Sequence, residues 1–471
     1  MVKDVDMSKK THLESDSMDD PIEVLAEQYW GAQTQRSLIH FSIGDDRMPK
    51  PVYHAYGYIK NAAAIINSAE GKVLKDKADL IIKVSKEIIS GKLDVQFPLY
   101  VWHSGSGTQT NMNVNEVISN RAIQIVGGVL GTKDPIHHND HVNMSQSSND
   151  TFPTAMYIAT VLEFANHLIP SIQALVKARV IKIGRTHLHD AIPLTVGQEW
   201  SGYATQLKDA LEIVEQSMNG LYKLAAGGTA VGTGLNAPKD FGQKIASVIS
   251  KLTGHPFVTA DNKFAAQGSL DGMVNASFAL RLLAVVLMKI ANDIRWLGSG
   301  PRGGLHELNL LSNEPGSSIM PGKVNPTQQE DMIMVCIQVI GNDTAVAIAG
   351  SQGNFELNAM RPIIIKNVLH SSCILADASD KFLRYSIEGI TLEKERIRYL
   401  NESLMLVTAL SPIIGYDKAS FIAHKALKEK TTLYSASISS GYISAEDFDR
   451  IVAPANMVGD PDKDLSTLSN T

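Results

Sequence analysis

The chain has 471 residues, a formal net charge of −6 and two cysteines. Hydrophobic residues make up 44% of it and charged residues 20%, which excludes a disordered chain, a collagen-like fibre and a disulfide scaffold. The acidic balance gives no support for nucleic-acid binding, which favours a basic face. A chain of this length is expected to form one large domain or two to three smaller ones.

The cysteines and the N-terminal residues bear on the compartment. Cys336 and Cys373 lie in apolar sequence, and two buried, reduced thiols fit a reducing compartment. Residues 1–20 lack the apolar core of a signal peptide, and their acidic side chains argue against a transit peptide. Uncharged apolar runs such as 282–288 are shorter than a membrane span. We therefore expect a cytoplasmic protein without a membrane segment.

The first third of the chain alternates between polar stretches and helical periodicity. Residues 1–55 are polar and are expected to wrap a surface, whereas 52–91 show the apolar spacing of helices. Small and polar residues at 104–107 indicate a loop, which passes into the run NMNVNEVISNRA (111–122), whose polar side chains alternate with apolar ones. A second polar stretch covers 134–150.

The middle of the chain predicts long helices. Within 200–224, apolar residues recur at spacings of three and four, which is one stripe of an amphipathic helix. Residues 271–297 are apolar nearly all round and would form a helix about 40 Å long. Residues 328–348 repeat this character, and a fourth helix is expected after Arg361. The sequence therefore predicts a long helical bundle as the central domain.

Little of the remaining chain reads as strand. Residues 180–183, before a Gly-Arg turn, are the best short candidate for a strand. Residues 394–410 read as one helix, and 431–452 as two more that are joined at Gly441. A small helical domain is therefore expected at the C-terminal end.

Residues 314–326 (EPGSSIMPGKVNP) form the most informative stretch. Two glycines and three prolines break it, and a helix is expected to begin directly after it. Lys323 and Asn325 would lie just before that helix, where backbone N–H groups and the helix dipole favour an anion. Ser317 and Ser318 add hydroxyl groups. A cation, an amide and hydroxyls at a helix N-terminus predict a carboxylate-binding site.

A histidine follows the strand candidate. His187 ends a Gly-Arg-Thr-His run, and imidazole can act as an acid or base near neutral pH when a carboxylate orients it. Glu330, in the first turn of the helix after the 314–326 loop, is a candidate for that carboxylate. A lone histidine is also often structural, so this pattern by itself decides nothing.

Three further runs have polar side chains. The runs 104–109 and 145–150 supply small donors and acceptors that suit either a binding site or turns and helix caps. His137 and His141 have the spacing of metal ligands on one helix. Pro135 and the polar residues around it indicate a loop instead, and no Cys or Glu completes a ligand set, so no metal site is expected there.

At these positions the sequence resembles the fumarase/aspartase superfamily, and within it the class II fumarate hydratases. The run GSSIMPGKVNPTQ (316–328) is similar to the signature loop of that family. The resemblance extends over nearly the whole chain, through WGAQTQRS (30–37), SGSGTQTNMNVNE (104–116), NMSQSSNDTFPTAM (143–156), IGRTHLHD (183–190), GGTAVGTGLN (227–236) and NESLMLVTAL (401–410). Aspartases instead carry Gln where this chain has His187, and Ala where it has Gly322.

The resemblance implies a mainly α fold of three domains. We expect an N-terminal, mostly helical domain over 1–146, a central long helical bundle over 147–395 and a small C-terminal helical domain over 396–471. In this family the bundles of four subunits associate into a tetramer core, and each active site is shared by three chains. A homotetramer is therefore expected.

The implied reaction is the reversible hydration of fumarate to (S)-malate through an aci-carboxylate intermediate, without a cofactor or a metal. Ser317 is the implied base at C3 of malate, and His187, oriented by Glu330, handles the leaving hydroxyl. Lys323 and Asn325 would stabilise the dianion. The carboxylates of the substrate would be held by Ser106, Thr108, Ser147, Ser148, Asn149, Thr186 and Ser318. A second dicarboxylate site is implied at His137, His138, Asn139 and Asp140.

The chain departs from the family in a few places. Residues 156–183 look shorter than in relatives, and His138 stands where the family usually has Pro. His306 replaces a usual Gly, and Leu311 and Ser312 replace a usual Pro-Glu pair. Two alternatives therefore stay open: a related lyase that releases an amine, as aspartase does, and a catalytically impaired homologue.

Overall fold

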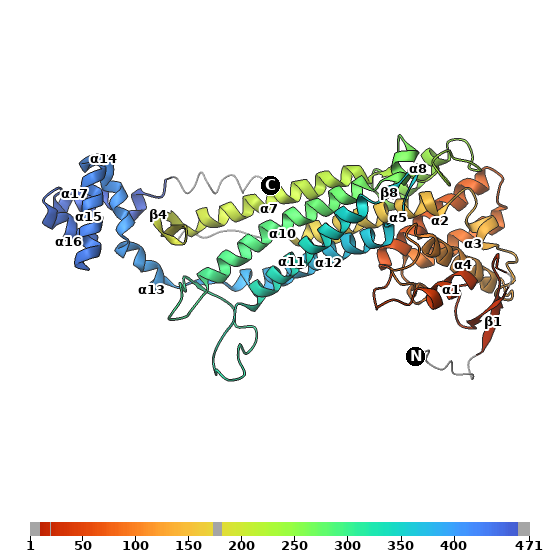
Figure 1. Cartoon of the computed structure of the whole chain (residues 1–471), viewed down its shortest axis with the longest axis horizontal. Coiled ribbons are helices and arrows are strands. Elements are labelled where there is room, and N and C mark those ends of the chain that lie inside the picture. The colour runs from red at the N-terminus through yellow and green to blue at the C-terminus, as the bar shows by residue number, and fades with distance from the viewer. Residues whose placement is uncertain (1–9, 19, 173–180, 460–471) are drawn as a thin grey trace. The chain divides into compact units, whose positions relative to one another are not determined.

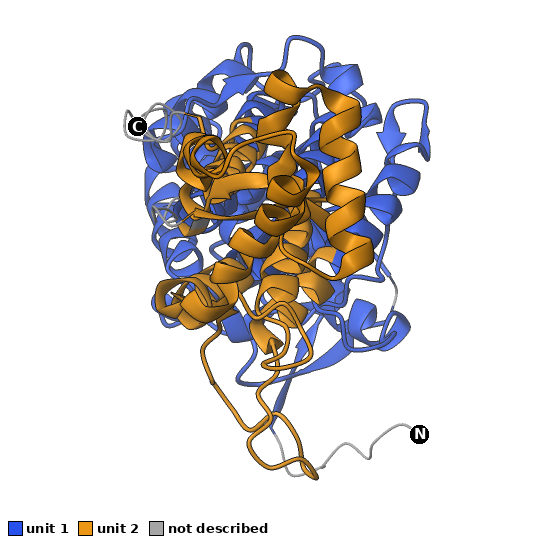
Figure 2. Ribbon diagram, turned by 90° about the vertical axis from the view of Figure 1, so that its left-hand side faces the viewer, with its two compact units in different colours: residues 1–170, 213–282, 337–376 blue, residues 171–212, 283–336, 377–471 orange. Residues whose placement is uncertain are grey.

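The computed structural model describes residues 10–18, 20–172 and 181–459 (Figure 1). Most of these residues are helical, and the strands among them are short and pair only two at a time. The mainly α fold class expected from the sequence is therefore confirmed. The chain divides into two compact units (Figure 2). Unit 1 contains 1–170, 213–282 and 337–376, and unit 2 contains 171–212, 283–336 and 377–471.

The long helices expected in the middle of the chain are present. They are α7 (Val196–Leu221), α10 (Asp271–Leu297), α11 (Thr327–Gly350) and α12 (Arg361–Tyr385). Each of them contributes residues to both units. In unit 1, an ion pair of 2.9 Å joins Arg281 to Asp343, so α10 contacts α11 there. In unit 2, the Tyr203 hydroxyl donates to Asp293 at 3.0 Å and links α7 to α10. These contacts fit the predicted bundle.

Unit 1 also holds shorter helices and small sheets. Its other main helices are α1 (Ala32–His40), α2 (Lys50–Ala69), α3 (Lys75–Ile89), α4 (Thr108–Ile125), α5 (Ser148–Glu163), α8 (Phe241–Thr253) and α9 (Lys263–Gly268). Strands β1 (Thr11–Glu14) and β2 (Ile22–Leu25) pair antiparallel, as do β8 (Gly353–Asn354) and β9 (Leu357–Asn358), whereas β5 (Lys223–Leu224) and β6 (Val258–Thr259) pair parallel. The helical pattern expected over 52–91 is confirmed, because α2 and α3 occupy most of this stretch.

Unit 2 combines a β-hairpin with the C-terminal helices. The hairpin consists of β3 (Ile181–Thr186) and β4 (His189–Thr195), and β7 (Leu308–Asn309) pairs with β10 (Thr391–Leu392). The helices are α13 (Lys394–Ile397), α14 (Ser411–Ile414), α15 (Tyr416–Glu429), α16 (Leu433–Ser440) and α17 (Ala445–Ile451). Ile183 of the hairpin is buried in one apolar core with residues of the C-terminal helices such as Leu410, Ile422 and Phe448. The hairpin is therefore held by the C-terminal part of the chain. The expected domain boundaries stay a prediction.

Two details of the expected local structure are wrong. Residues 394–410 form α13 followed by 3₁₀ turns at Arg398–Glu402 and Leu404–Leu410 instead of one helix, because Ser403 caps a new turn in mid-segment. The turn after the short strand is not at Gly184-Arg185, because Gly184 lies inside β3 at a register shift. Val180, the first residue of the predicted strand, lies outside the described residues. The joint at Gly441 is confirmed, since it ends α16 with φ of 73°.

Two of the long helices are long and apolar enough to cross a membrane. The most apolar windows of α10 and α11 have mean hydropathies of 1.8 and 1.7, and 50% and 39% of these windows are buried within the chain. As expected, the uncharged apolar runs are short. The charged residues within α10 and α11 are few, however, so both helices are strongly apolar. Helices in the core of a large bundle have the same length and composition. The ion pair between Arg281 and Asp343 joins α10 to α11, as expected for two neighbouring helices of such a bundle.

Candidate functional site

A chain of hydrogen-bonded hydroxyls links two of the predicted binding runs within unit 1. The Ser104 and Ser106 hydroxyl oxygens are 2.9 Å apart, and Ser106 is 3.0 Å from the Thr108 hydroxyl. The Thr108 hydroxyl in turn lies 2.8 Å from that of Ser148. We call these four side chains the hydroxyl chain. It brings together three of the predicted carboxylate-holding residues, which lie up to 42 positions apart in the sequence (148 − 106).

The hydroxyl chain is built at two helix N-termini. Gly107 precedes α4 with φ of 82°, and a Cβ there would lie 2.1 Å from the Phe152 ring, so only glycine fits. Ser147 caps α5: its hydroxyl accepts from the Asn149 N–H at 3.2 Å, and Asp150 accepts from the Ser147 N–H at 3.0 Å. Helix N-termini direct free N–H groups and the positive dipole end outward, which favours an anion.

Asp150 connects this site to the glycine-rich run 227–234. Its carboxylate is buried and also accepts from the N–H groups of Gly227 at 2.9 Å and Thr229 at 3.0 Å. Burial raises the pKa of the Asp150 carboxyl to about 6, and the three N–H donors oppose that rise. A Cβ at Gly227 would lie 2.7 Å from the Cα of Gly242, so the run is a close crossing of backbones.

Arg361 is the central support of this region, and sequence reasoning missed it. Its side chain is fully buried, and its guanidinium donates to the carbonyls of Ser106 at 3.4 Å, Asn149 at 3.0 Å and Gln267 at 2.8 Å. Burial lowers the Arg361 pKa to about 10, so the side chain stays charged at neutral pH. The only local signal was an arginine before Pro362 in an otherwise apolar helix start.

In unit 2, His187 lies at the tip of the β3–β4 hairpin. His187 and Leu188 have φ of 57° and 61° between the paired residues Thr186 and His189, which is the backbone of a two-residue type I′ turn. Two consecutive residues other than glycine in this conformation carry strain, and such strain is concentrated at functional sites. His187 is exposed.

A buried ion network holds that hairpin in place. The Lys182 ammonium lies 2.8 Å from Glu199 and 3.0 Å from Glu307, and Arg185 pairs with Glu307 as well. Lys182 and Glu307 are almost completely buried, so their charges compensate each other. The network fixes β3, which ends at Thr186, directly before His187.

The 314–326 loop, also in unit 2, is mostly exposed. Its turn is closed by a hydrogen bond from the Gly316 N–H to the Lys323 carbonyl, 2.9 Å, and by one from the Asn325 amide to the Gly316 carbonyl, 2.6 Å. The Ser317 hydroxyl oxygen accepts from the N–H groups of Ile319 at 3.3 Å and Met320 at 3.0 Å. Donors aimed at this oxygen would favour its alkoxide form. Ser318 is exposed beside it.

A cavity of about 720 Å³ lies beside this loop and brings three predicted residues together, Lys323, Asn325 and Glu330. Arg295 also lines it and donates to Glu330 at 3.0 Å. Within the described residues the Glu330 carboxylate thus pairs with Arg295 and not with His187. His306 lines the same cavity with φ of 49°, a conformation that glycine adopts without strain.

The residues of the predicted second site form a compact π-helical turn in unit 1. The His137 ring nitrogen Nδ1 accepts from the N–H groups of Asn139 and Asp140, each at 3.1 Å. The His138 ring stacks on that of His137 with a centroid distance of 4.7 Å. Burial lowers the His138 pKa to about 4, so this ring is neutral. An anion bound here would have to displace the His137 ring from the two N–H groups.

The comparisons with known proteins agree over nearly the whole chain. A sequence family described as "Lyase" matches residues 20–341, and one described as "Fumarase C C-terminus" matches 406–459. The chain is 70% identical over 466 residues to "Fumarate hydratase class II" of Methanosarcina acetivorans, covering 97% of this chain and 96% of that one. It is 55% identical over 450 residues to the mitochondrial fumarate hydratase of Homo sapiens, covering 93% and 88%.

A solved structure gives the same result for the fold. The crystal structure of a class II fumarase from Schistosoma mansoni superimposes with a TM-score of 0.91 at 40% identity. The match covers 96% of this chain and 99% of that one, so the expected fold is confirmed. The chain therefore belongs to the lyase family of the class II fumarate hydratases.

Proposed function

We propose that this chain is a carbon–oxygen lyase that catalyses the reversible hydration of fumarate to (S)-malate. The observation that carries this function is the 70% identity to a class II fumarate hydratase over nearly the whole of both chains. The cavity lined by Lys323, Arg295 and the Asn325 amide adds cationic and polar groups that suit a dicarboxylate.

Ser317 is the proposed base that removes the C3 proton of malate. A serine hydroxyl is barely ionised at neutral pH, so its alkoxide has to be stabilised. The N–H groups of Ile319 and Met320 donate to the Ser317 oxygen and supply that stabilisation. The C3 proton passes to Ser317, and the electron pair left on carbon delocalises into the neighbouring carboxylate as an aci-carboxylate.

The dianion formed in this way is stabilised by fixed charge and hydrogen bonds. Lys323 and Asn325 line the cavity from the C-terminal side of the loop and are proposed to face the developing charge. The two carboxylates of the substrate are proposed to be held by the polar groups Ser106, Thr108, Ser147, Ser148, Asn149, Thr186 and Ser318. The hydroxyl chain supports this role, because its members already lie within hydrogen-bonding distance of one another.

His187 is proposed to protonate the leaving hydroxyl, through a water molecule, so that water departs from C2. Its proposed orienting partner Glu330 is paired with Arg295 in the same chain, so we place the His187–Glu330 contact between chains of an oligomer. Residues His137, His138, Asn139 and Asp140 stay a proposed second dicarboxylate site. No step of this reaction needs a cofactor.

The function is tested by following the fumarate absorbance band after purified protein is mixed with (S)-malate. We expect the absorbance to rise, and to fall again when fumarate is the starting substrate. Aspartate serves as the control substrate, with released ammonia measured by a coupled assay. Ammonia release without malate dehydration would assign an amine-releasing lyase instead, and absence of both activities an impaired homologue.

The roles of Ser317 and His187 are separated by isotope exchange. We expect Ser317→Ala to abolish the exchange of deuterium into C3 of malate, measured by NMR. His187→Asn is expected to slow mainly the step that involves water and to change the pH dependence of the rate. Exchange at the wild-type rate in Ser317→Ala, with loss of exchange in His187→Asn, would reverse the two assignments.

We further propose that the chain assembles into a homotetramer through its long helices. Large apolar side chains of α10 and α11 are exposed in the single chain, among them Phe278, Val285, Met334, Ile337 and Ile348. Such side chains are expected to be covered by other subunits. Light scattering of the purified protein tests this, and a fully active monomer would contradict it.

The cytoplasm is the proposed compartment. Cys336 and Cys373 form no disulfide in the structure, which fits a reducing environment. Fractionation of the source cells, with the enzyme assay on each fraction, tests this placement.

A further inference from the structure

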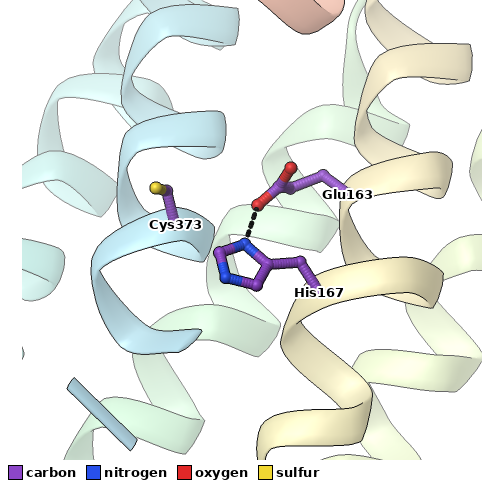
Figure 3. A group of neighbouring side chains, drawn as sticks. All are labelled: Glu163, His167 and Cys373. Atoms are coloured by element: carbon purple, nitrogen blue, oxygen red, sulfur yellow. Dashed lines mark hydrogen bonds and ion pairs between the residues drawn. The ribbon is translucent and has the colours of Figure 1, made fainter. Parts of the chain in front are cut away.

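Three potential metal ligands from two helices of unit 1 meet outside the site described above. Glu163 ends α5, and His167 follows it in the π-helical turn Phe164–Leu168. Cys373 lies on α12, which faces that turn (Figure 3). Among the described residues, this is the only group of three or more His, Cys, Asp or Glu side chains whose ligand atoms lie close enough to hold one ion.

The distances in this group suit a single small cation. The His167 Nδ1 atom lies 2.8 Å from the Glu163 carboxylate, and the three ligand atoms all lie within 4.8 Å of one another. In a tetrahedral zinc site, bond lengths of about 2.0 to 2.3 Å place neighbouring ligand atoms about 3.3 to 3.8 Å apart. The distance between Glu163 and His167 is shorter than that spacing and the common limit of 4.8 Å lies above it, so small side-chain shifts would complete the three ligands.

The chemistry of the ligands narrows the class of ion. An oxygen, a nitrogen and a sulfur donor together favour a borderline-soft divalent metal over magnesium or calcium, which select oxygen ligands. Three protein ligands leave a fourth tetrahedral position for water. A hydrogen bond between Glu163 and His167 alone would need no metal. The third donor, a thiol from a different helix, is what distinguishes this group from such a pair.

We propose that Glu163, His167 and Cys373 bind one borderline-soft divalent ion such as Zn²⁺. The bound ion would join the C-terminal end of α5 to α12. The ion would replace the direct hydrogen bond between Glu163 and His167. Glu163 lies 15 residues after Ser148 along α5, about 22 Å at the helical rise. The ion therefore takes no part in the hydration step, and its role is to stabilise the helix ends.

The test uses the full-length, reduced protein after treatment with a chelator. Competition with a chromophoric chelator measures Zn²⁺ binding, and Co²⁺ reports on the ligands through its visible d–d bands and a thiolate-to-cobalt charge-transfer band. We expect one ion per chain and a charge-transfer band in the wild type. Cys373→Ser is expected to lose that band and to bind Zn²⁺ at least about tenfold more weakly, since even outer partners of a metal site contribute that much.

Cys336→Ser is the matched control, because Cys336 is the other thiol of the chain and is fully buried in α11. It is expected to keep the band and the wild-type affinity. Saturating Zn²⁺ is expected to raise Tm by at least about 2 °C in the wild type and in Cys336→Ser, but not in Cys373→Ser. The rate of malate dehydration is expected to be the same with and without Zn²⁺.

Three outcomes would overturn the proposal. The first is a Zn²⁺ dissociation constant larger than about 100 µM. The second is a charge-transfer band that persists in Cys373→Ser, and the third is loss of the charge-transfer band in Cys336→Ser. If Cys373→Ser does not fold, Glu163→Gln and His167→Gln take its place. Both are expected to weaken Zn²⁺ binding at least about tenfold while the thiolate band is retained but shifted.

Discussion

The hydroxyl chain of unit 1 and the 314–326 loop of unit 2 contribute the same kinds of polar groups in opposite structural settings. The backbone around the hydroxyl chain is held by two fully buried charged side chains, Arg361 and Asp150. Each of these side chains makes three hydrogen bonds to backbone groups. The loop is mostly exposed and is closed by a few hydrogen bonds of its own, with Ile319 84% exposed.

Under the proposed function, the two regions are expected to divide substrate binding and the chemical step. A region held by buried charges is preorganised, so that it can orient a substrate at little entropic cost. An exposed loop can close over a substrate and exclude water only when the substrate is present. Damage to the first region should therefore affect stability and binding together, whereas damage to the proposed catalytic groups of the loop should affect mainly turnover.

The largest expected effect comes from Lys323→Ala in the loop. Removing one preorganised donor from a developing anion costs on the order of 3 kcal/mol, so kcat is expected to fall by about 10²- to 10³-fold. The free energy of unfolding should change by less than about 0.5 kcal/mol, because Lys323 is exposed. Steady-state kinetics and urea denaturation measure the two effects, with Glu314→Gln as a control on the same loop. Near-normal turnover would remove Lys323 from the mechanism.

Arg361→Ala removes the buried support of the hydroxyl chain and should show the opposite pattern, a loss of stability together with weaker substrate binding. Three backbone carbonyls lose their donor, so we expect the free energy of unfolding to fall by about 3 kcal/mol and KM to rise. Arg361→Lys keeps the charge but has a less suitable geometry, and should recover part of both losses. A variant that is destabilised but retains the wild-type KM would show that Arg361 supports the fold without positioning the site.

A smaller effect on stability is expected from Lys60, which is fully buried and contacts Gln146 in the 145–150 run. Its ammonium donates to Asn111, Asn143 and Gln146, and burial lowers its pKa from 10.5 to about 7, against the attraction of Asp150. Between these two pKa values the unfolded chain binds the proton and the folded chain does not. The contribution of Lys60 to the free energy of unfolding should therefore increase with pH, by up to about 1.4 kcal/mol per unit.

Urea denaturation at pH 7, 8 and 9 measures this slope. Lys60→Met removes the titrating group and keeps a long side chain, so the difference between wild type and variant isolates Lys60. We expect the wild type to gain stability relative to the variant as the pH rises. Equal slopes would mean that Lys60 keeps its proton in the folded state.

The smallest expected effect concerns His306 beside the loop. A left-handed backbone costs a residue with a Cβ roughly 1 kcal/mol, and the greater entropy of unfolded glycine offsets part of the gain. His306→Gly should therefore raise the free energy of unfolding by less than about 1 kcal/mol. His306→Ala, which keeps the Cβ at φ of 49°, is the matched control and should bring no gain. An equal gain in both variants would assign the effect to the imidazole instead of the backbone.

The sequence by itself determined the long helices and the identity of the loop. The bounds expected for the 271–297 helix are those of α10, because an almost continuous apolar surface leaves few other structures. The motif residues of the resemblance predicted the family and the activity. The prediction of one continuous helix over 394–410 was wrong, because helical composition does not reveal that Ser403 starts a new turn.

Only the tertiary structure decided which polar groups meet. Arg361 has no local motif around it, yet it holds the backbone of the two binding runs together. The pairing of Glu330 with Arg295, and the approach of Cys373 to Glu163 and His167, join helices that are far apart in sequence. Periodicity reports which face of an element is apolar. The partners of a buried charge depend on desolvation and packing in three dimensions, which act between residues with no fixed spacing along the chain.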